Sequence, residues 1–329
     1  MLAAERPPRA GYAWPRMVEH VTVLAGGVGG ARFLDGLVRL IPPERVTVIG
    51  NVADDLEILG LHVSPDLDTV VYTLAGVVEP ARGWGLADDT AGTLASVARL
   101  GGDDWFHLSD GDIGLHLVRT ERLRRGEPLS AITRDVCERF GLAVSLLPAT
   151  DDRLRTIVTT EAGELDFQTY FVRRRHADEV SAIRYEGAAE ARPGPGVIEA
   201  LTGADLVVLA PSNPFLSIDP ILAVPGVREA VCARTGPVAA VSPIVGGRAL
   251  KGPADRLLRS LAGEASPVSV ARHYSDVLTH LLLDTVDAAL VPAVEALGIR
   301  AAATDTLMPD GERRAAVARA LLAHVAATP

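Results

Sequence analysis

The sequence is poor in aromatic residues, cysteine and positive charge. These shortages limit the kind of core, the kind of binding partner and the kind of cysteine site that the protein can have. Aromatic residues are only 4% of the 329 positions, so the core must come from the aliphatic side chains that dominate the 48% apolar fraction. Such a core is typical of sheets covered by helices on both faces. The chain is long enough for one large α/β domain or two smaller ones.

Basic residues are outnumbered, and the formal net charge is −10. This balance argues against non-specific nucleic-acid binding, because phosphate contacts need a basic face. Arginines still cluster at 122–125 and 173–175, either as solvated surface or as contacts for a small anion. No apolar run approaches the about 20 residues that a membrane span needs, so no membrane partner is expected.

The only two cysteines, Cys137 and Cys232, lie in apolar helical patterns without metal-ligand neighbours. We interpret both as buried thiols of a protein in the reducing cytoplasm. Residues 1–16 lack the apolar segment of a secretory signal. They are predicted to be a disordered extension, with either Met1 or Met17 as the true start.

Strands and helices alternate along most of the chain, beginning with a β-α-β unit over residues 21–52. Further helices are expected at about 68–76, 88–100, 111–125, 130–140, 221–235 and 311–326. Further strands are expected at 205–211, 237–244 and 298–308. The intervening residues 144–190 alternate in polarity and predict a β-rich insert. Residues 17–143 and 191–329 therefore predict an α/β fold, a doubly wound, mostly parallel Rossmann-like sheet.

Four glycines follow the first predicted strand: Gly26, Gly27, Gly29 and Gly30. A tight turn needs one or two glycines, whereas four let backbone N–H groups approach a phosphate at the start of a helix. The dinucleotide fingerprint is broken, since Arg32 replaces its third glycine and Asn51 occupies the tip of the second strand, where an acid would bind the ribose. The loop favours a phosphate or nucleotide other than NAD.

Four aspartates lie within 15 residues around a predicted strand end: Asp54, Asp55, Asp66 and Asp68. Clustered carboxylates repel one another unless a cation neutralises them, and carboxylates with few His or Cys partners suit Mg²⁺ or Mn²⁺. The alternative is local structure, with Asp68 as a helix N-cap.

Two more polar loops follow predicted strands, at the edge where ligands bind in such sheets. Ser212 and Asn213 lie between prolines in the first loop, as expected of a rigid binding loop. Ser242 and Lys251 flank a Gly-Gly pair in the second loop and predict another anion contact.

Asp112, His116 and Arg119 share one face of a predicted helix, at spacings i, i+4 and i+7. This stripe is either solvent-exposed or a substrate wall, with Arg119 on a phosphate. The sequence contains no Ser-His-Asp order and no Cys-His pair that would indicate covalent catalysis.

Taken together, these motifs resemble the 2-phospho-L-lactate transferases of coenzyme F420 biosynthesis, including their phosphoenolpyruvate-using members. The resemblance covers about residues 20 to 308, in the family's order. Its motifs here are "GGVGGARFLDGL", "NVADDLEILGLHVSPDLDTVVYTL", "GWG…DDTAGT", "SDGDIGLHLVRT", "LLPATDD", "DFQTYFVRR", "APSNPFLSIDPIL", "VSPIVGGRALKGPA" and "TDTLM".

The resemblance implies a Mg²⁺-dependent homodimeric enzyme. It would transfer a phospho-lactyl or phospho-enolpyruvyl group from a guanylylated donor to the terminal hydroxyl of the deazaflavin Fo, and GMP would leave. No residue in the sequence distinguishes the lactyl from the enolpyruvyl donor.

The same resemblance assigns roles to residues of this chain. Asp55 and Asp68 match the family's metal-site acids and rank above Asp54 and Asp66, and either Asp55 or Asp68 is a candidate to accept the hydroxyl proton. The glycine loop, with Arg32, and the "PSNP" loop match the nucleotide site. Five residues match motifs near the acceptor: Asp89, Thr90, Asp112, His116 and Arg119. Gly111 stands where the family has an arginine.

Two other functions compete with this one. A related family of non-catalytic, nucleotide-sugar-binding regulatory proteins shares the glycine loop and the "DD" region, but not the "DFQTYFVRR" and "TDTLM" motifs. The hypothesis of a nicotinamide dehydrogenase is weakened by Arg32 and Asn51, which break the dinucleotide fingerprint.

Overall fold

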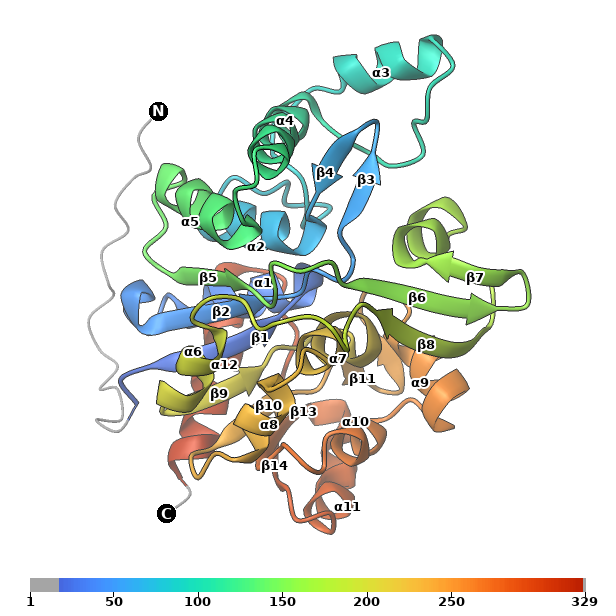
Figure 1. The fold of residues 1–329 in the computed structure, drawn as a ribbon. Helices are drawn as coiled ribbons and strands as arrows, with labels where there is room; N and C mark the ends of the chain where they lie inside the picture. The colour runs from blue at the N-terminus through green and yellow to red at the C-terminus, as the bar shows by residue number, and fades with distance from the viewer. Residues whose placement is uncertain (1–17, 328–329) are drawn as a thin grey trace.

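The computed structural model describes residues 18–327, so the predicted extension 1–16 lies outside the described residues. Its centre is a sheet of seven strands, all parallel, which confirms the predicted α/β class (Figure 1). In spatial order the strands are β14 (Arg300–Thr304), β13 (His280–Asp284), β10 (Val238–Val241), β9 (Leu206–Leu209), β1 (Val21–Ala25), β2 (Val46–Gly50) and β5 (Ser145–Pro148).

The order of the strands reverses direction at β1. From β1 the chain builds outward through β2 and β5, then crosses to β9 on the other side and continues to β14. The loops after β1 and β9 therefore diverge above neighbouring strands, which is the place where open α/β sheets bind ligands.

Helices cover both faces of the sheet because successive strand residues point to opposite sides. In β1, Val23 packs in one apolar cluster and Leu24 in the other. The Val23 side contains α1 (Gly27–Leu37), α2 (Pro65–Ala75), α5 (Leu129–Arg139) and α12 (Gly311–Ala326). The Leu24 side contains α6 (Val197–Gly203), α7 (Asp219–Leu222), α8 (Val227–Cys232), α9 (Ala254–Ala262), α10 (Pro267–His273) and α11 (Val291–Glu295).

The expected helix at 221–235 is wrong as a single element. It is divided into α7 and α8, because Pro225 lacks an N–H and Gly226 has a φ of 85°, outside the helical region. The irregular turns are η1 (Pro43–Arg45), η2 (Thr169–Arg173), η3 (Pro214–Ile218) and η4 (Thr285–Leu290).

A small antiparallel sheet lies beside the main sheet in Figure 1, with strand order β7 (Gly163–Asp166), β6 (Arg155–Thr160), β8 (Val180–Glu186). The expected insert 144–190 therefore begins too early, because β5 belongs to the main sheet. Its "TYFVR" segment is the helical turn η2, although its β-branched and aromatic residues favoured a strand.

The remaining elements rise above the β2 end of the sheet in Figure 1: the hairpin β3 (Leu56–Ile58) and β4 (Leu61–Val63), with α3 (Gly92–Arg99) and α4 (Asp110–Arg124). A second hairpin joins β11 (Ile244–Val245) to β12 (Arg248–Ala249). Cys137 is buried as expected, but Cys232 is exposed near the end of α8, so its predicted burial is wrong. Within residues 18–327, every helix is too short or too polar to cross a bilayer.

Candidate functional site

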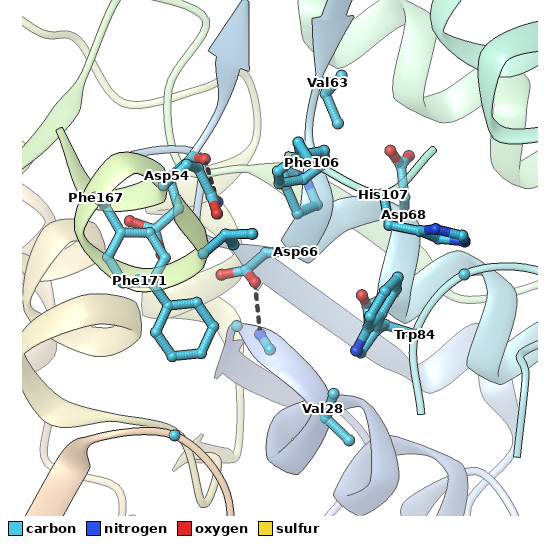
Figure 2. A pocket seen from close by; sticks show the side chains of 18 of the residues that line it. Val28, Asp54, Val63, Asp66, Asp68, Trp84, Phe106, His107, Phe167 and Phe171 are labelled. Carbon is cyan, nitrogen blue, oxygen red and sulfur yellow. Dashed lines mark hydrogen bonds between the residues drawn. The ribbon is translucent and has the colours of Figure 1, made fainter. Parts of the chain in front are cut away.

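A cavity of about 610 Å³ opens at the carboxyl end of β1, between the main sheet, the small sheet and α4 (Figure 2). Ten of the residues singled out in the sequence line it: Gly26, Gly27, Gly29, Asp54, Asp66, Asp68, Asp112, His116, Asn213 and Lys251. Nine others do not: Gly30, Arg32, Asn51, Asp55, Asp89, Thr90, Arg119, Ser212 and Ser242.

The glycine loop needs its glycines because other chain segments press against it. A Cβ on Gly29 would lie 2.2 Å from the carbonyl oxygen of Pro211, in the loop after β9. A Cβ on Gly26 would lie 2.4 Å from Asp66 Oδ2, and Gly27 has a φ of 63°. The bare backbone therefore faces the cavity at the start of α1, where N–H groups favour an anion.

The loop after β9 holds this arrangement in place. Ser212 Oγ donates to the carbonyl of Gly26 over 2.8 Å, so its hydroxyl fixes the glycine loop rather than facing the cavity. Asn213 lines the cavity, and its Oδ1 accepts from the amide of Phe215. Its Nδ2 is buried without a hydrogen-bond partner among the described residues, so it is a donor available to a ligand.

The four aspartates do not form one cluster. Asp66 lines the cavity, accepting from Gly27 N at 2.8 Å and from Asn51 Nδ2 at 3.0 Å. Asp54 lies beside it, and its Oδ1 is buried without a partner among the described residues. Burial and the neighbouring Asp66 raise the pKa of Asp54, and burial raises that of Asp66 to about 6.

The other two aspartates are bonded to a hydroxyl, an imidazole or a guanidinium, although Asp55 Oδ1, like Asp54 Oδ1, is buried without a partner among residues 18–327. Asp55 accepts from Ser64 Oγ at 2.7 Å and lies 3.1 Å from His62 Nε2. Asp68 is paired through both oxygens with the buried guanidinium of Arg119. Among residues 18–327, Asp54 and Asp66 are thus the two of the four aspartates without a cationic or imidazole partner.

Within residues 18–327 no group of three or more His, Cys, Asp or Glu side chains is arranged to hold a metal ion. A magnesium ion needs fewer protein ligands when substrate phosphates complete its octahedron. Asp54 and Asp66 fit that arrangement, because a buried carboxylate oxygen without a partner lies next to a second carboxylate.

The polar face of α4 is buried, so the solvent-exposed interpretation of this stripe is wrong. The exposed fractions of Asp112, His116 and Arg119 are 6%, 2% and 3%. Asp112 and His116 line the cavity, whereas Arg119 pairs with Asp68 behind them.

Three residues assigned to the site have structural partners instead. Asp89 accepts from the amides of Thr90 and Gly111, and Thr90 Oγ1 donates to Asp110. Asp89 and Thr90 therefore hold the first turn of α4 in place. Ser242 Oγ donates to the carbonyl of Ile244 and accepts from its amide, which closes a turn.

Two cations lie where the glycine loop meets the segment around Gly83. A Cβ on Gly83 would lie 3.5 Å from both Arg32 Nη2 and Lys251 Nζ, and Lys251 Nζ donates to the backbone carbonyl of Arg82. The guanidinium of Arg82 lies over the Trp84 ring and 3.2 Å from His107 Nε2. None of the three cationic side chains has a carboxylate partner among residues 18–327. Burial and the charge of Arg32 lower the pKa of Lys251. A bound anion would relieve this repulsion.

Aromatic side chains form much of the cavity lining, and none of them was predicted from the sequence to belong to the site. Two of the three tryptophans and three of the six phenylalanines line the cavity: Trp84, Trp105, Phe106, Phe167 and Phe171. The rings of Phe167 and Phe171 stack with centroids 5.2 Å apart, on the left of Figure 2. In a chain so poor in aromatics, the Trp and Phe side chains around residues 84, 105 and 167–171 were the available signal.

The motifs behind this geometry match a known family. The profile described as "2-phospho-L-lactate transferase CofD" matches residues 21–317. The chain belongs to this family. The family's transferases include a phosphoenolpyruvate transferase from Streptomyces griseus, 48% identical over 309 residues, which cover 92% of this chain and 97% of that protein. One from Kitasatospora aureofaciens is 46% identical over 311 residues, with coverages of 92% and 97%.

Among solved structures, a UPF0052-family protein from Bacillus halodurans superposes with a TM-score of 0.60 and 15% identity, covering 93% of this chain and 99% of that chain. At that identity the likeness shows a shared fold alone. The predicted family membership is confirmed, and with it a transferase of this family.

Proposed function

We propose that this transferase moves a phospho-lactyl or phospho-enolpyruvyl group from a guanylylated donor to the terminal hydroxyl of the deazaflavin Fo, with GMP as the leaving group. Such a reaction belongs to coenzyme F420 biosynthesis. The observation that carries the proposal is a single cavity lined by the glycine loop, by cations and by aromatic rings. Arg82 and Lys251 line it together with Trp84 and Phe171, and the guanidinium of Arg82 lies 4.8 Å from the centroid of the Trp84 ring.

The glycine loop and the cations suit the donor. Backbone N–H groups at the start of α1, together with Arg32, Arg82 and Lys251, would bind the diphosphate that joins GMP to the transferred group. The aromatic rings suit the acceptor, because a flat deazaflavin ring gains by stacking on Phe and Trp side chains. The two relatives named phosphoenolpyruvate transferase favour the enolpyruvyl donor.

In the reaction, the Fo hydroxyl oxygen forms a bond to the phosphorus of the transferred group. The bond from that phosphorus to the bridging oxygen breaks, and GMP carries away the electron pair. The hydroxyl proton leaves the attacking oxygen and is taken up by the departing phosphate oxygen or by solvent. Transfer of this kind depends on positioning and charge neutralisation more than on a strong nucleophile. Mg²⁺ held by Asp54 and Asp66 would neutralise the diphosphate. The protein's own side chains would align the hydroxyl and exclude water.

Substitution of two cationic side chains tests the proposed donor site. Arg32→Gln and Lys251→Gln should each weaken donor binding by about 10- to 100-fold, which is typical of a lost charge-assisted hydrogen bond. The matched control is Arg125→Gln, since Arg125 is exposed and paired with Glu121. Calorimetric titration with the guanylylated donor measures the three affinities. Equal affinity in all variants would contradict this placement of the diphosphate.

The rival function is that of a nucleotide-sugar-binding regulator. It predicts equal or better thermal protection by UDP-sugars than by guanine nucleotides, whereas the transferase predicts the reverse, with further protection by Mg²⁺. We also propose that the enzyme is cytoplasmic and a homodimer, which light scattering tests.

A further inference from the structure

His116 lies between a buried ion pair and the cavity. It belongs to α4, lines the cavity and is only 2% exposed. Its Nδ1 lies 3.3 Å from Arg119 Nη1, within hydrogen-bond geometry. Its other ring nitrogen, Nε2, has no hydrogen-bond partner among residues 18–327.

Arg119 settles which ring nitrogen carries the proton. A guanidinium only donates hydrogen bonds, so Nδ1 must be the acceptor and cannot hold a hydrogen. Asp68 fixes the guanidinium in this orientation, because its Oδ2 accepts from Nη1 at 3.0 Å and its Oδ1 accepts from Nη2. One Nη1 hydrogen goes to Asp68 and the other to His116.

The doubly protonated ring is disfavoured at this position. A protonated Nδ1 would need a carboxylate, but Asp68 Oδ2 is 3.8 Å away, too far for a hydrogen bond. Burial and the charge of Arg119 lower the pKa of His116, against the opposing influence of Asp68 and Asp112. The ring is therefore neutral, and its single hydrogen is on Nε2.

We propose that His116 is a fixed hydrogen-bond donor, which presents Nε2–H to an acceptor atom of the bound substrate and does not accept its proton. Asp68 and Arg119 are positioning residues, since they act through His116. The site then selects a substrate with an oxygen lone pair at this point, such as a carbonyl, hydroxyl or phosphate oxygen. It disfavours one that presents an N–H group there. The identity of that substrate rests on the proposed function.

The tautomer can be observed without any substrate. In the full-length protein labelled with ¹⁵N-histidine, long-range ¹H–¹⁵N spectra distinguish a protonated from an unprotonated ring nitrogen. Comparison with His116→Gln assigns the signal. We expect an unprotonated Nδ1 and a protonated Nε2 at pH 7. A protonated Nδ1 would overturn the proposal whatever reaction the enzyme performs.

Two variants separate the donor from the contact with Arg119. The side chain of His116→Gln places an amide N–H near the position of Nε2 but loses Nδ1. That of His116→Asn places an amide oxygen near Nδ1, where it accepts from Arg119, but loses the donor. We expect kcat/KM for transfer to Fo to fall less than about tenfold in His116→Gln. In His116→Asn it should fall by about 10²-fold or more if the acceptor oxygen carries developing charge.

The opposite order, with His116→Asn active and His116→Gln inactive, would show that the ring only supports Arg119 and would overturn the proposal. Equal loss in both variants would also overturn it. Absence of turnover in the unmodified enzyme would contradict the proposed function alone, because the tautomer is measured without substrate.

Discussion

The amide of Gly27 donates to Asp66 Oδ1 over 2.8 Å, so the glycine loop already holds a carboxylate of its own chain (Figure 2). This bond joins the start of α1 to the first turn of α2, the two segments proposed to bind phosphate and metal. The proposed nucleotide and metal sites are thus adjacent, as transfer from a metal-bound diphosphate would require.

Asp54→Asn should lower the activity and raise the stability of the protein. The raised pKa of Asp54 means that its ionised form costs free energy in the folded state, and this cost increases as the pH rises above the unfolded value. The melting temperature of the variant should therefore exceed that of the wild type, by more at pH 8 than at pH 5. Turnover should fall by about 10²–10³-fold and recover partly at high Mg²⁺.

The matched variant is Asp55→Asn, at the neighbouring position outside the cavity. Burial raises the pKa of Asp55 too, but its bonds to His62 and Ser64 oppose the shift, so the gain in stability should be smaller than in Asp54→Asn. The variant should keep the Mg²⁺ dependence of the wild type. If Asp55→Asn rather than Asp54→Asn changes that dependence, the metal assignment to Asp54 and Asp66 is wrong.

The buried pair of Asp68 and Arg119 should show strong coupling in a double-mutant cycle. Arg119→Met leaves a carboxylate buried without its cation, and Asp68→Leu leaves the cation, so each should cost about 3–5 kcal/mol of unfolding free energy. The double variant should recover much of this loss, since two apolar side chains need no partner. Urea denaturation measures all four proteins, and additive losses would argue against a paired role.

Gly29→Ala should damage the site through packing alone. The new Cβ would meet the carbonyl of Pro211, so the glycine loop and the β9 loop must separate. We expect a lower melting temperature and weaker nucleotide binding. Gly114→Ala is the control: it lies in α4 with nothing within 4 Å of the new Cβ, and should add about 0.5–1 kcal/mol of stability. Similar melting temperatures in both variants would contradict the close approach.

His280 should make the fold acid-sensitive. Burial, with the nearby His324, lowers its pKa from 6.5 to about 4. Between these values the unfolded chain binds a proton that the folded chain does not, so stability falls as the pH drops from 6.5 to 4. His280→Asn should remove on the order of 3 kcal/mol of that loss. Urea titrations at pH 7 and pH 4 test this, and identical pH dependence in both proteins would refute it.

The sequence carried enough information for the architecture, because hydrophobic periodicity and glycine placement are local signals. Gly29 and Asn213 were identified from patterns and do line the cavity. The partner of a carboxylate is not a local signal, however. Asp54, Asp55 and Asp68 read alike in the sequence, and only the fold brings Arg119 to one, His62 to another and no cation to the third.

The aromatic lining of the cavity was not predicted from the sequence for a similar reason. Trp84 and Trp105 come from two loops and Phe171 from the turn η2. They share no periodicity, and each alone looks like an isolated surface or packing residue. Their common function emerges only where the small sheet and the loops before α4 meet over the cavity.

The most direct measurement is incubation of the purified protein with Fo, Mg²⁺ and each synthetic guanylylated donor, followed by mass spectrometry. We predict a phosphodiester of Fo bearing the lactyl or enolpyruvyl group, formed in equal amount with GMP and only when Mg²⁺ is present. Absence of both products with either donor, from protein shown to be folded, would contradict the account.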